Sequence, residues 1–548
     1  MVRRSYDYIV VGAGSAGCTL ANRLSQDRAI SVLLLEAGGW DRHPLVKLPL
    51  GWGKVLLNRI YDWGYDTEPE ASLNNRRIEV ARGKVIGGSS TINAMAYVRG
   101  NRADYDRWAS YGLPQWSYEN VLPYFRKQES WEGGADAYRG GDGPMATRKS
   151  RYRDPLVDAY LDAAISSGYA LNDDYNGAKQ DGFARMQMTI RGGWRESAAD
   201  AYLHPVLSRS NLTTIVHAHV TRVVLEKKRA VGVEFAKGGE RHVVIADREV
   251  ILSAGAINSP QLLMLSGIGP ADELKAHGIG IAADLPGVGQ NLQDHAAALL
   301  VYGRKDTSPL VRNMRIDRVA VGFAKGFIFG TGFMTDLPGG ITAFVKSSVE
   351  EPLPNIQLLF ISGSLAASPY LAPIKQPFAD SFACRIVLLR PESRGSITLS
   401  SANAFRHPRV TQGLLSTPND WRKLRDGIKL FRELAHSSKL VPYVAREIGP
   451  GPNVIDERQL EAFTRKTAVT AHHPAGTCRM GPPTEASAVV DQQLRVIGVE
   501  RLRVVDASVF PDLVGGNINA PVIMVAEKAA EFVSGQGRDA QPKTNAEN

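Results

Sequence analysis

The stretch that decides the fold is YIVVGAGSAG, at residues 8–17. Its β-branched start at residues 8–11 predicts a strand, and the residues after the glycines follow a helical pattern to residue 24. A second apolar run at residues 32–35 ends on Glu36. Strand, glycine turn, helix and strand within about thirty residues indicate a βαβ unit. Continuous apolar strands of this kind are typical of a parallel sheet that is buried on both faces.

The glycine pattern Gly12-x-Gly14-x-x-Gly17 predicts a dinucleotide site in this context. Gly12 permits the tight turn, Gly14 lets the backbone approach a pyrophosphate, and Gly17 allows close helix–strand packing. The helix N-terminus then offers free N–H groups to the anion. We expect Glu36 to accept hydrogen bonds from a ribose hydroxyl pair. The pattern by itself does not decide between FAD and NAD.

A second glycine-rich loop, RGKVIGGSSTINAM, occupies residues 82–95. It is basic at its start, and it lacks the upstream glycine of a phosphate-binding Walker A loop. A second backbone cradle suits a cofactor that is wrapped over its whole length and retained, although a generic loop has the same composition.

The amino-acid composition excludes several classes of protein. The chain has 548 residues, of which 44% are hydrophobic and 22% charged, which is typical of a globular protein. Its net charge of +9 is a mild excess at this length and does not predict nucleic-acid binding. Three dispersed cysteines exclude a disulfide framework, and we expect Cys18 and Cys478 to be buried and inert. The sequence predicts neither a secretory signal nor a membrane span, so we expect a soluble, cytoplasmic protein.

Other segments predict further elements. Short strands at residues 213–216, 219–225, 231–235 and 242–245 predict an antiparallel meander, followed by a buried strand at residues 249–252. Ser259 and Pro260 are typical of a helix N-cap and first turn. Residues 421–435 and 521–532 predict two further helices. The middle of the chain, about 300–460, is richer in proline and reads as a separate, sheet-containing domain.

These motifs, with four more, resemble the glucose–methanol–choline (GMC) oxidoreductase family. The others are GAINSPQLLMLSGIG at residues 255–269, HHPAGTCRMG at 472–481, VDASVFP at 505–511 and GNINAP at 516–521. They stand in the family's order and span nearly the whole chain, and they are most similar to bacterial choline-dehydrogenase-like and alcohol-dehydrogenase-like members.

The resemblance implies a mixed α/β fold (α+β), with a Rossmann-like FAD-binding domain and a second, sheet-containing substrate-binding domain. We expect the FAD-binding domain at residues 1–155, 191–300 and 465–535, the substrate domain at residues 156–190 and 301–464, and a disordered tail at residues 536–548. The implied activity is FAD-dependent oxidation of a primary alcohol to the aldehyde, with electrons passing to oxygen or a quinone-like acceptor.

The resemblance also assigns site residues. It matches His473 to the catalytic histidine and Asn517 to its partner. The expected cofactor contacts are Gly12, Gly14, Ser15, Ala16, Gly17, Glu36, Ala37, Arg82, Val85, Gly87, Gly88, Ser89, Asn93, Ala94, Met95, Ala96, Val220, Ala254, Gly255, Asp506, Ala507, Asn517, Asn519, Ala520 and Pro521.

Alcohol oxidation needs a base for the hydroxyl proton, and a histidine titrates near neutrality. Asn517 cannot take a proton, but its NH₂ can donate to a developing alkoxide. From the residues alone His472 and His473 are equal candidates, and the family pattern favours His473. These histidines with Cys478 do not predict a metal site, because no fourth ligand with zinc-like spacing is near.

Two questions stay open in the sequence. The segment at residues 312–334 mixes basic and aromatic residues, so it is either a lid over the substrate cleft or a peripheral contact with the inner face of the cytoplasmic membrane. The reaction class has alternatives too: a cyanohydrin-cleaving, FAD-containing lyase on the same fold, a nicotinamide-dependent dehydrogenase, or a non-catalytic flavin-binding protein. Neither the particular alcohol nor the oligomeric state follows from the sequence.

Overall fold

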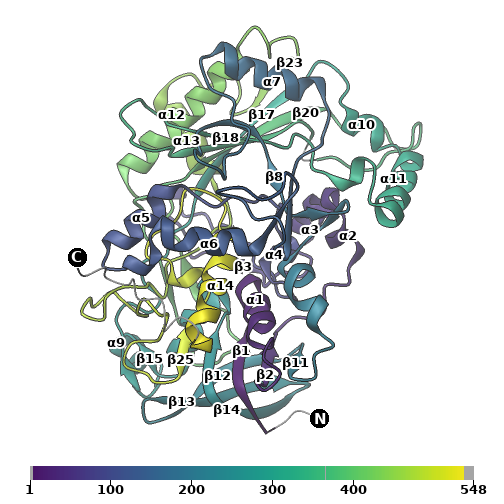
Figure 1. Cartoon of the computed structure of the whole chain (residues 1–548). Coiled ribbons are helices and arrows are strands. Elements are labelled where there is room, and N and C mark those ends of the chain that lie inside the picture. The colour runs from purple at the N-terminus through teal and green to yellow at the C-terminus, as the bar shows by residue number, and fades with distance from the viewer. Residues whose placement is uncertain (1–3, 365, 536–548) are drawn as a thin grey trace, which may run out of the picture.

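The computed structural model describes residues 4–364 and 366–535, so the expected tail at residues 536–548 lies outside the described part of the chain. Two seven-stranded sheets dominate the structure (Figure 1). Figure 1 places the first sheet, with β1, β2 and β11–β14, at one end of the molecule, and the second, with β17, β18, β20 and β23, toward the other. The mixed α/β fold is therefore confirmed.

The first sheet has the strand order β11-β2-β1-β14-β13-β12, with β25 added on β14. Its strands are β1 (Ser5–Val11), β2 (Val32–Leu35), β11 (Leu212–Ile215), β12 (His219–Glu226), β13 (Arg229–Lys237), β14 (Glu240–Leu252) and β25 (Leu502–Val504). Tyr8 of β1 pairs with Val32 of β2 in parallel register, and helix α1 (Ser15–Leu24) connects the two strands. The predicted βαβ unit is confirmed.

The predicted meander needs correction. β11 does not join the antiparallel strands but adds to β2 in parallel, with Leu212 opposite Val32. The runs predicted at residues 242–245 and 249–252 form one strand, β14. Its first half pairs antiparallel with β13 and its second half parallel with β1, so the meander and the nucleotide-type sheet are continuous.

The second sheet is antiparallel, in the order β23-β17-β20-β19-β18-β7, with β24 paired to β17. These strands are β7 (Gly182–Arg185), β17 (Ala296–Arg304), β18 (Ile341–Val345), β19 (Ile356–Ile361), β20 (Ser381–Leu388), β23 (Val444–Gly449) and β24 (Val469–Thr470). One face packs on α7 (Pro155–Ser166) and α12 (Pro418–Ala435), through Tyr160 and Phe431 among others. The expected domain boundary at residue 300 falls inside β17, and the domain limits stay a prediction.

Helix α8 (Gly255–Leu265) begins five residues before Pro260, the predicted first helical residue, so the assignment of Ser259 as its N-cap is wrong. Pro260 lies inside the helix and has no N–H to give to the carbonyl of Ala256. The hydroxyl of Thr477 donates to that carbonyl at 2.6 Å in its place, which lets the helix start directly after β14. The predicted C-terminal helix is present as α14 (Asn519–Ser534), and it packs against α1.

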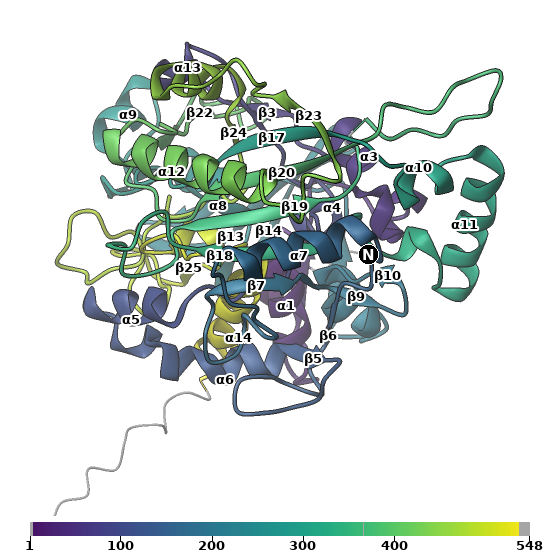
Figure 2. The same ribbon diagram turned by 90° about the horizontal axis from the view of Figure 1, so that it is seen from above.

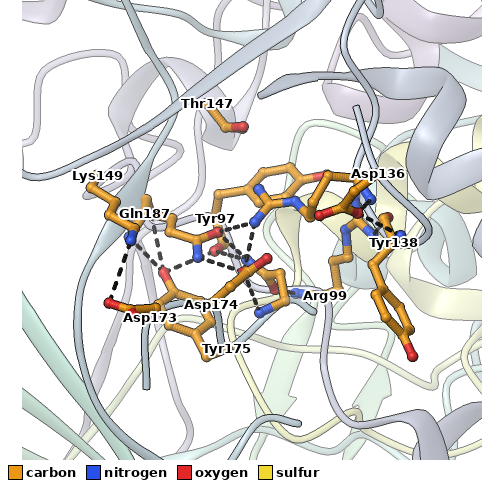
Figure 3. Close-up of polar contacts among 12 residues, drawn as sticks. Tyr97, Arg99, Asp136, Tyr138, Thr147, Lys149, Asp173, Asp174, Tyr175 and Gln187 are labelled. Atoms are coloured by element: carbon orange, nitrogen blue, oxygen red, sulfur yellow. Dashed lines mark hydrogen bonds and ion pairs between the residues drawn. The ribbon is translucent and has the colours of Figure 1, made fainter. Parts of the chain in front are cut away.

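A buried charge network fixes the chain that follows the second glycine loop (Figure 3). Arg99 and Arg139 both bind the buried Glu129, and Arg139 also reaches Asp174 at 2.7 Å. The backbone N–H of Tyr97 donates to the carbonyl of Gln187 at 2.8 Å. Because these partners are paired and buried, residues 93–96 are anchored on a rigid support.

Helix α11 (Ile316–Phe329) projects from one side of the molecule together with α10 (Pro309–Asn313) (Figures 1 and 2). Within α11 only Gly322 and Gly326 are buried, and Ile328 and Phe329 are 68% and 71% exposed. No helix in the described part of the chain has the length and hydropathy needed to cross a membrane.

The remaining elements are short or peripheral. The helices are α2 (Pro44–Lys47), α3 (Trp52–Leu57), α4 (Ser89–Ile92), α5 (Arg102–Ser110), α6 (Tyr118–Gln128), α9 (Ala271–Ala276) and α13 (Glu457–Thr467), and the strands are β3 (Tyr65–Asp66), β4 (Glu79–Val80), β5 (Glu129–Trp131), β6 (Met145–Lys149), β8 (Gln187–Met188), β9 (Ile190–Arg191), β10 (Trp194–Arg195), β15 (Ile268–Gly269), β16 (Ala283–Asp284), β21 (Ser396–Thr398) and β22 (Arg409–Thr411). Cys18 and Cys478 are buried, as expected, and Cys384 is buried as well.

Candidate active site

A cavity of about 690 Å³ runs from the first glycine turn to the second sheet. Its lining combines the β1–α1 turn, the second glycine loop, the start of α8, and residues 471–474 and 517–519. Leu359 and Arg385 of the second sheet line it as well. The two motifs that the sequence separates by hundreds of residues, the glycine turn and the His472-His473 pair, therefore open on one cavity.

The glycines of the two loops leave a groove that other residues would fill. Gly12 has φ +96°, and a Cβ there would lie 2.6 Å from the carbonyl oxygen of Ser253. A Cβ on Gly88 would lie 2.7 Å from the Cα of Gly14, while a Cβ on Gly14 itself would meet open space. The N–H of Gly87 donates to the carbonyl of Ala13 at 2.7 Å, which joins the loops. This exposed backbone beside the N-terminus of α1 fits a dinucleotide pyrophosphate.

Glu36 lines the same cavity at the end of β2. Its carboxylate accepts hydrogen bonds from the N–H groups of Ala13 and Gly38, at 2.9 and 2.8 Å. Burial raises the pKa of Glu36 to about 7, against the opposing effect of these two N–H groups. Each oxygen keeps a lone pair free for a ribose hydroxyl, because a carboxylate has about four acceptor positions.

Most of the predicted cofactor contacts reach the cavity. Those that line it are Gly12, Gly14, Ser15, Ala16, Glu36, Ala37, Arg82, Gly88, Ser89, Asn93, Ala94, Met95, Ala96, Val220, Ala254, Gly255, Asp506, Ala507, Asn517 and Asn519. Gly17, Val85, Gly87, Ala520 and Pro521 do not line it. Gly17 lies behind the wall, where a Cβ would come within 1.8 Å of the carbonyl oxygen of Gly12, so its role is packing.

His473 and Asn517 meet at the cavity wall. The Nδ2 of Asn517 lies 3.1 Å from the Nε2 of His473, and its Oδ1 accepts a hydrogen bond from Gln357 at 3.2 Å. Because Asn517 accepts from Gln357 through its oxygen, its NH₂ is left to donate to the imidazole. The Nε2 of His473 is therefore unprotonated and accepts from Asn517, a neighbour that also lines the cavity.

The other nitrogen of His473 contacts a second histidine, which the sequence analysis missed. The Nδ1 atoms of His473 and His295 lie 2.9 Å apart, so one donates and the other accepts. With Nε2 of His473 unprotonated, its Nδ1–H is the donor and the Nδ1 of His295 is the acceptor. His295 is completely buried, and burial lowers its pKa to about 4. The signal in the sequence was the polar pair Asp294-His295 directly before an apolar strand.

Asp294 clamps the backbone of the same segment. Its Oδ1 accepts the N–H of His473 at 2.8 Å, and its Oδ2 accepts from Thr470 and Gln412. Arg82 donates to the carbonyl of His472 from the opposite side. The histidine segment is thus held through its backbone, which leaves the His473 ring free to face the cavity.

Electrostatics keep His473 neutral. Burial, followed by repulsion from His295 in its protonated form and by the charge of Arg82, lowers the pKa of His473 well below its usual value near 6.5. His472 also lines the cavity, and burial lowers its pKa to about 3. Its Nδ1 is buried without a hydrogen-bond partner among the described residues. Only His473 of the two has a partner on each ring nitrogen, which fixes its orientation.

This geometry defines a class: a dinucleotide-binding oxidoreductase with a histidine–asparagine pair at the far end of its cofactor groove. Sequence profiles agree, because the GMC oxidoreductase profile matches residues 6–297 and its C-terminal part residues 391–526. The chain therefore belongs to the GMC oxidoreductase family. As a member it is an FAD-dependent enzyme that oxidises alcohols.

Individual relatives cover nearly the whole chain. Human mitochondrial choline dehydrogenase is 44% identical over 97% of this chain and 90% of its own length. The oxygen-dependent choline dehydrogenase of Sinorhizobium fredii is 42% identical over 97% and 96%. Among solved structures, pyridoxine 4-oxidase from Mesorbium loti superposes with a TM-score of 0.85 at 32% identity, covering 96% of this chain and 99% of that one. Formate oxidase of Aspergillus oryzae gives a TM-score of 0.88 at 27% identity, with 98% and 100% covered.

Proposed function

We propose that the protein oxidises a primary alcohol to the aldehyde, with His473 as the general base. The observation that carries this proposal is the unprotonated Nε2 of His473, which faces the NH₂ of Asn517 on the cavity wall at 3.1 Å. An alcohol hydroxyl that displaces this contact would donate its proton to the freed Nε2 and accept a hydrogen bond from the NH₂ of Asn517. The developing negative charge on oxygen is then stabilised by the amide.

The flavin supplies the acceptor for the hydride that leaves the alcohol carbon. The hydroxyl proton is taken up by a residue of this chain. His473 becomes an imidazolium in the transition state, and its Nδ1–H keeps its hydrogen bond to His295 throughout. His295 therefore acts as a positioning residue: it holds the ring in the tautomer whose Nε2 can accept a proton.

The N-terminus of α14 opens on the same cavity, because Asn519 is a lining residue. We propose that its positive dipole end stabilises negative charge on the bound cofactor, an effect of about 0.3–1 kcal/mol that rises to about 2 kcal/mol on partial burial. The hydroxyl of Ser15 donates to Oδ1 of Asn519 at 2.7 Å, which joins α14 to the glycine turn.

We also propose a cytoplasmic enzyme that contacts an anionic membrane through α11 and passes electrons to oxygen or to a quinone-like acceptor. The supporting observation is that every residue of α11 is described and none lines the cavity, so its exposed phenylalanines do not cover the substrate. Leu310 and Met314, just before α11, do line it. Exposed Arg315, Arg318 and Lys325 give the apolar helix a basic border that suits such a surface.

An anaerobic titration tests the reaction. The purified yellow holoenzyme should lose its visible flavin absorbance when a primary alcohol is added, with one equivalent of aldehyde formed. A flavin that no alcohol bleaches would favour the cyanohydrin-cleaving lyase or a non-catalytic flavoprotein, and it would overturn the proposal.

A further inference from the structure

Arg385 lies in the middle of β20 and faces the cavity. Its neighbours Cys384 and Ile386 pack among the helices on the opposite side of the sheet. Since successive side chains of a strand point to opposite faces, the side chain of Arg385 points away from that core. It lines the cavity beside Leu359, its cross-strand partner on β19.

The guanidinium of Arg385 makes no hydrogen bond or ion pair with another described residue. Its Nε is buried without a partner, and burial lowers the pKa of the group with no carboxylate nearby to offset it. The half-buried Arg82 and the buried Arg195 also lack a carboxylate partner but donate to backbone carbonyls, and other buried arginines are ion-paired. Arg304, for example, binds Asp154 at 2.8 Å. A half-buried cation without a partner is costly, so such a group on the wall of a cavity is typical of a site that receives an anion.

The cavity wall has three carboxylates, none of which pairs with Arg385, although Oε1 of Glu79 is buried without a partner among the described residues. They are Glu36, Glu79 and Asp506. Glu36 accepts two backbone N–H groups, Asp506 accepts from Gly255 and Ser259, and Glu79 lies 3.6 Å from the guanidinium of Arg59. A cationic alcohol near His473 would therefore face Arg385 without a described carboxylate to balance its charge.

We propose that Arg385 binds an anionic group of the substrate, so that the enzyme acts on an alcohol that carries a carboxylate. This inference rests on the proposed function for the oxidised end of the molecule. The carboxylate itself does not react: it forms charge-assisted hydrogen bonds with the guanidinium and leaves unchanged in the product. It would also cancel the positive charge that Arg385 places near His473, and so make the base more basic once substrate is bound.

Two readouts test the proposal on the holoenzyme. The first is kcat/KM for ω-hydroxy carboxylates of increasing chain length against their primary amides, which have the same shape without the charge. The second is calorimetric binding of butyrate and hexanoate, which lack the hydroxyl and cannot be oxidised. We expect the wild type to have a higher kcat/KM for the carboxylates than for the amides. In Arg385→Met the ratio of the two kcat/KM values and the affinity for hexanoate should each fall roughly 100-fold. Arg385→Lys, which keeps the charge, should recover part of each.

Binding of hexanoate to the His473→Ala holoenzyme separates this proposal from the proposed reaction. If hexanoate binds that variant and its affinity depends on Arg385, the anion site stands whether or not any alcohol is oxidised. Equal kcat/KM for carboxylates and amides, or hexanoate affinity unchanged in Arg385→Met, would overturn it. A shift of the flavin spectrum or potential in Arg385→Met with unchanged discrimination would assign the guanidinium to the cofactor instead.

Discussion

The Nδ1 atoms of His473 and His295 lie 2.9 Å apart, at the point where the C-terminal histidine segment meets the start of β17. This contact joins a residue of the candidate active site to a fully buried one, and it gives the Nδ1–H of His473 an acceptor once Asn517 has fixed the tautomer. The chemistry of the site follows from this pairing together with the amide of Asn517 on the other side of the ring.

The most direct prediction concerns the loss of the proposed base, His473. His473→Ala should retain FAD, because the side chain is not part of the glycine groove, and should slow flavin reduction by about 10²–10⁴-fold. Rapid-mixing spectroscopy under anaerobic conditions measures the rate. His472→Ala is the matched control and should stay much closer to the wild type. Near-normal reduction in His473→Ala would move the base to His472 or another group.

The positioning role of His295 has its own signature. His295→Leu removes the acceptor for the Nδ1–H of His473, so the tautomer is no longer fixed, and flavin reduction should slow by roughly 10- to 100-fold. In His295→Gln the side-chain oxygen can accept the same proton, and part of the rate should return. A purely structural role would lower thermal stability in both variants without this rescue, and equal rates in the two would argue against positioning.

The rate of flavin reduction should fall on acidification only well below pH 6.5. Burial, the charges of Arg82 and Arg385, and the repulsion that a protonated His473 would meet from a protonated His295 or His472 hold the pKa of His473 well below 6.5. The neutral, proton-accepting form therefore persists at neutral pH, and the rate falls only as the pH drops toward that lowered pKa. Arg385→Met removes one positive charge and should move this fall to higher pH. A wild-type fall centred above pH 6.5 would contradict this.

Glu36 should act on cofactor retention alone. Glu36→Ala removes the acceptor at the end of β2 and releases the N–H groups of Ala13 and Gly38, which weakens the groove. We expect a lower FAD content after gel filtration, with an unchanged reduction rate in the fraction that keeps its flavin. A variant with full FAD content, or with slow reduction per bound flavin, would contradict the assignment.

Helix α11 can be tested by flotation with anionic liposomes. The double variant Phe327→Ser, Phe329→Ser should float less than the wild type, because it removes aromatic groups from the exposed face. Val349→Ser, Ile455→Ser is the control, since both residues are more than 80% exposed and lie outside α11. Equal flotation of the wild type and the α11 variant, or flotation of neither, would contradict the proposal that α11 contacts a membrane.

The sequence by itself determined the βαβ unit, the two glycine loops and the family, because these depend on local periodicity and on glycines whose backbone conformation no other residue adopts easily. It placed Glu36 at the end of its strand for the same reason. It did not determine that β11 runs parallel to β2, or that α8 starts at Gly255, since both depend on partners far along the chain, such as Thr477 for the carbonyl of Ala256.

Only the tertiary structure decided which side chains share the cavity. His295 directly precedes β17 and Arg385 lies in an otherwise apolar strand, so the sequence does not show what either side chain contacts, and each acquires its role from strand pairing in the second sheet. The same packing gave His473 a partner on each nitrogen and left Arg385 with none. Local sequence specifies backbone shape, whereas the protonation and pairing of a buried group depend on everything that surrounds it in space.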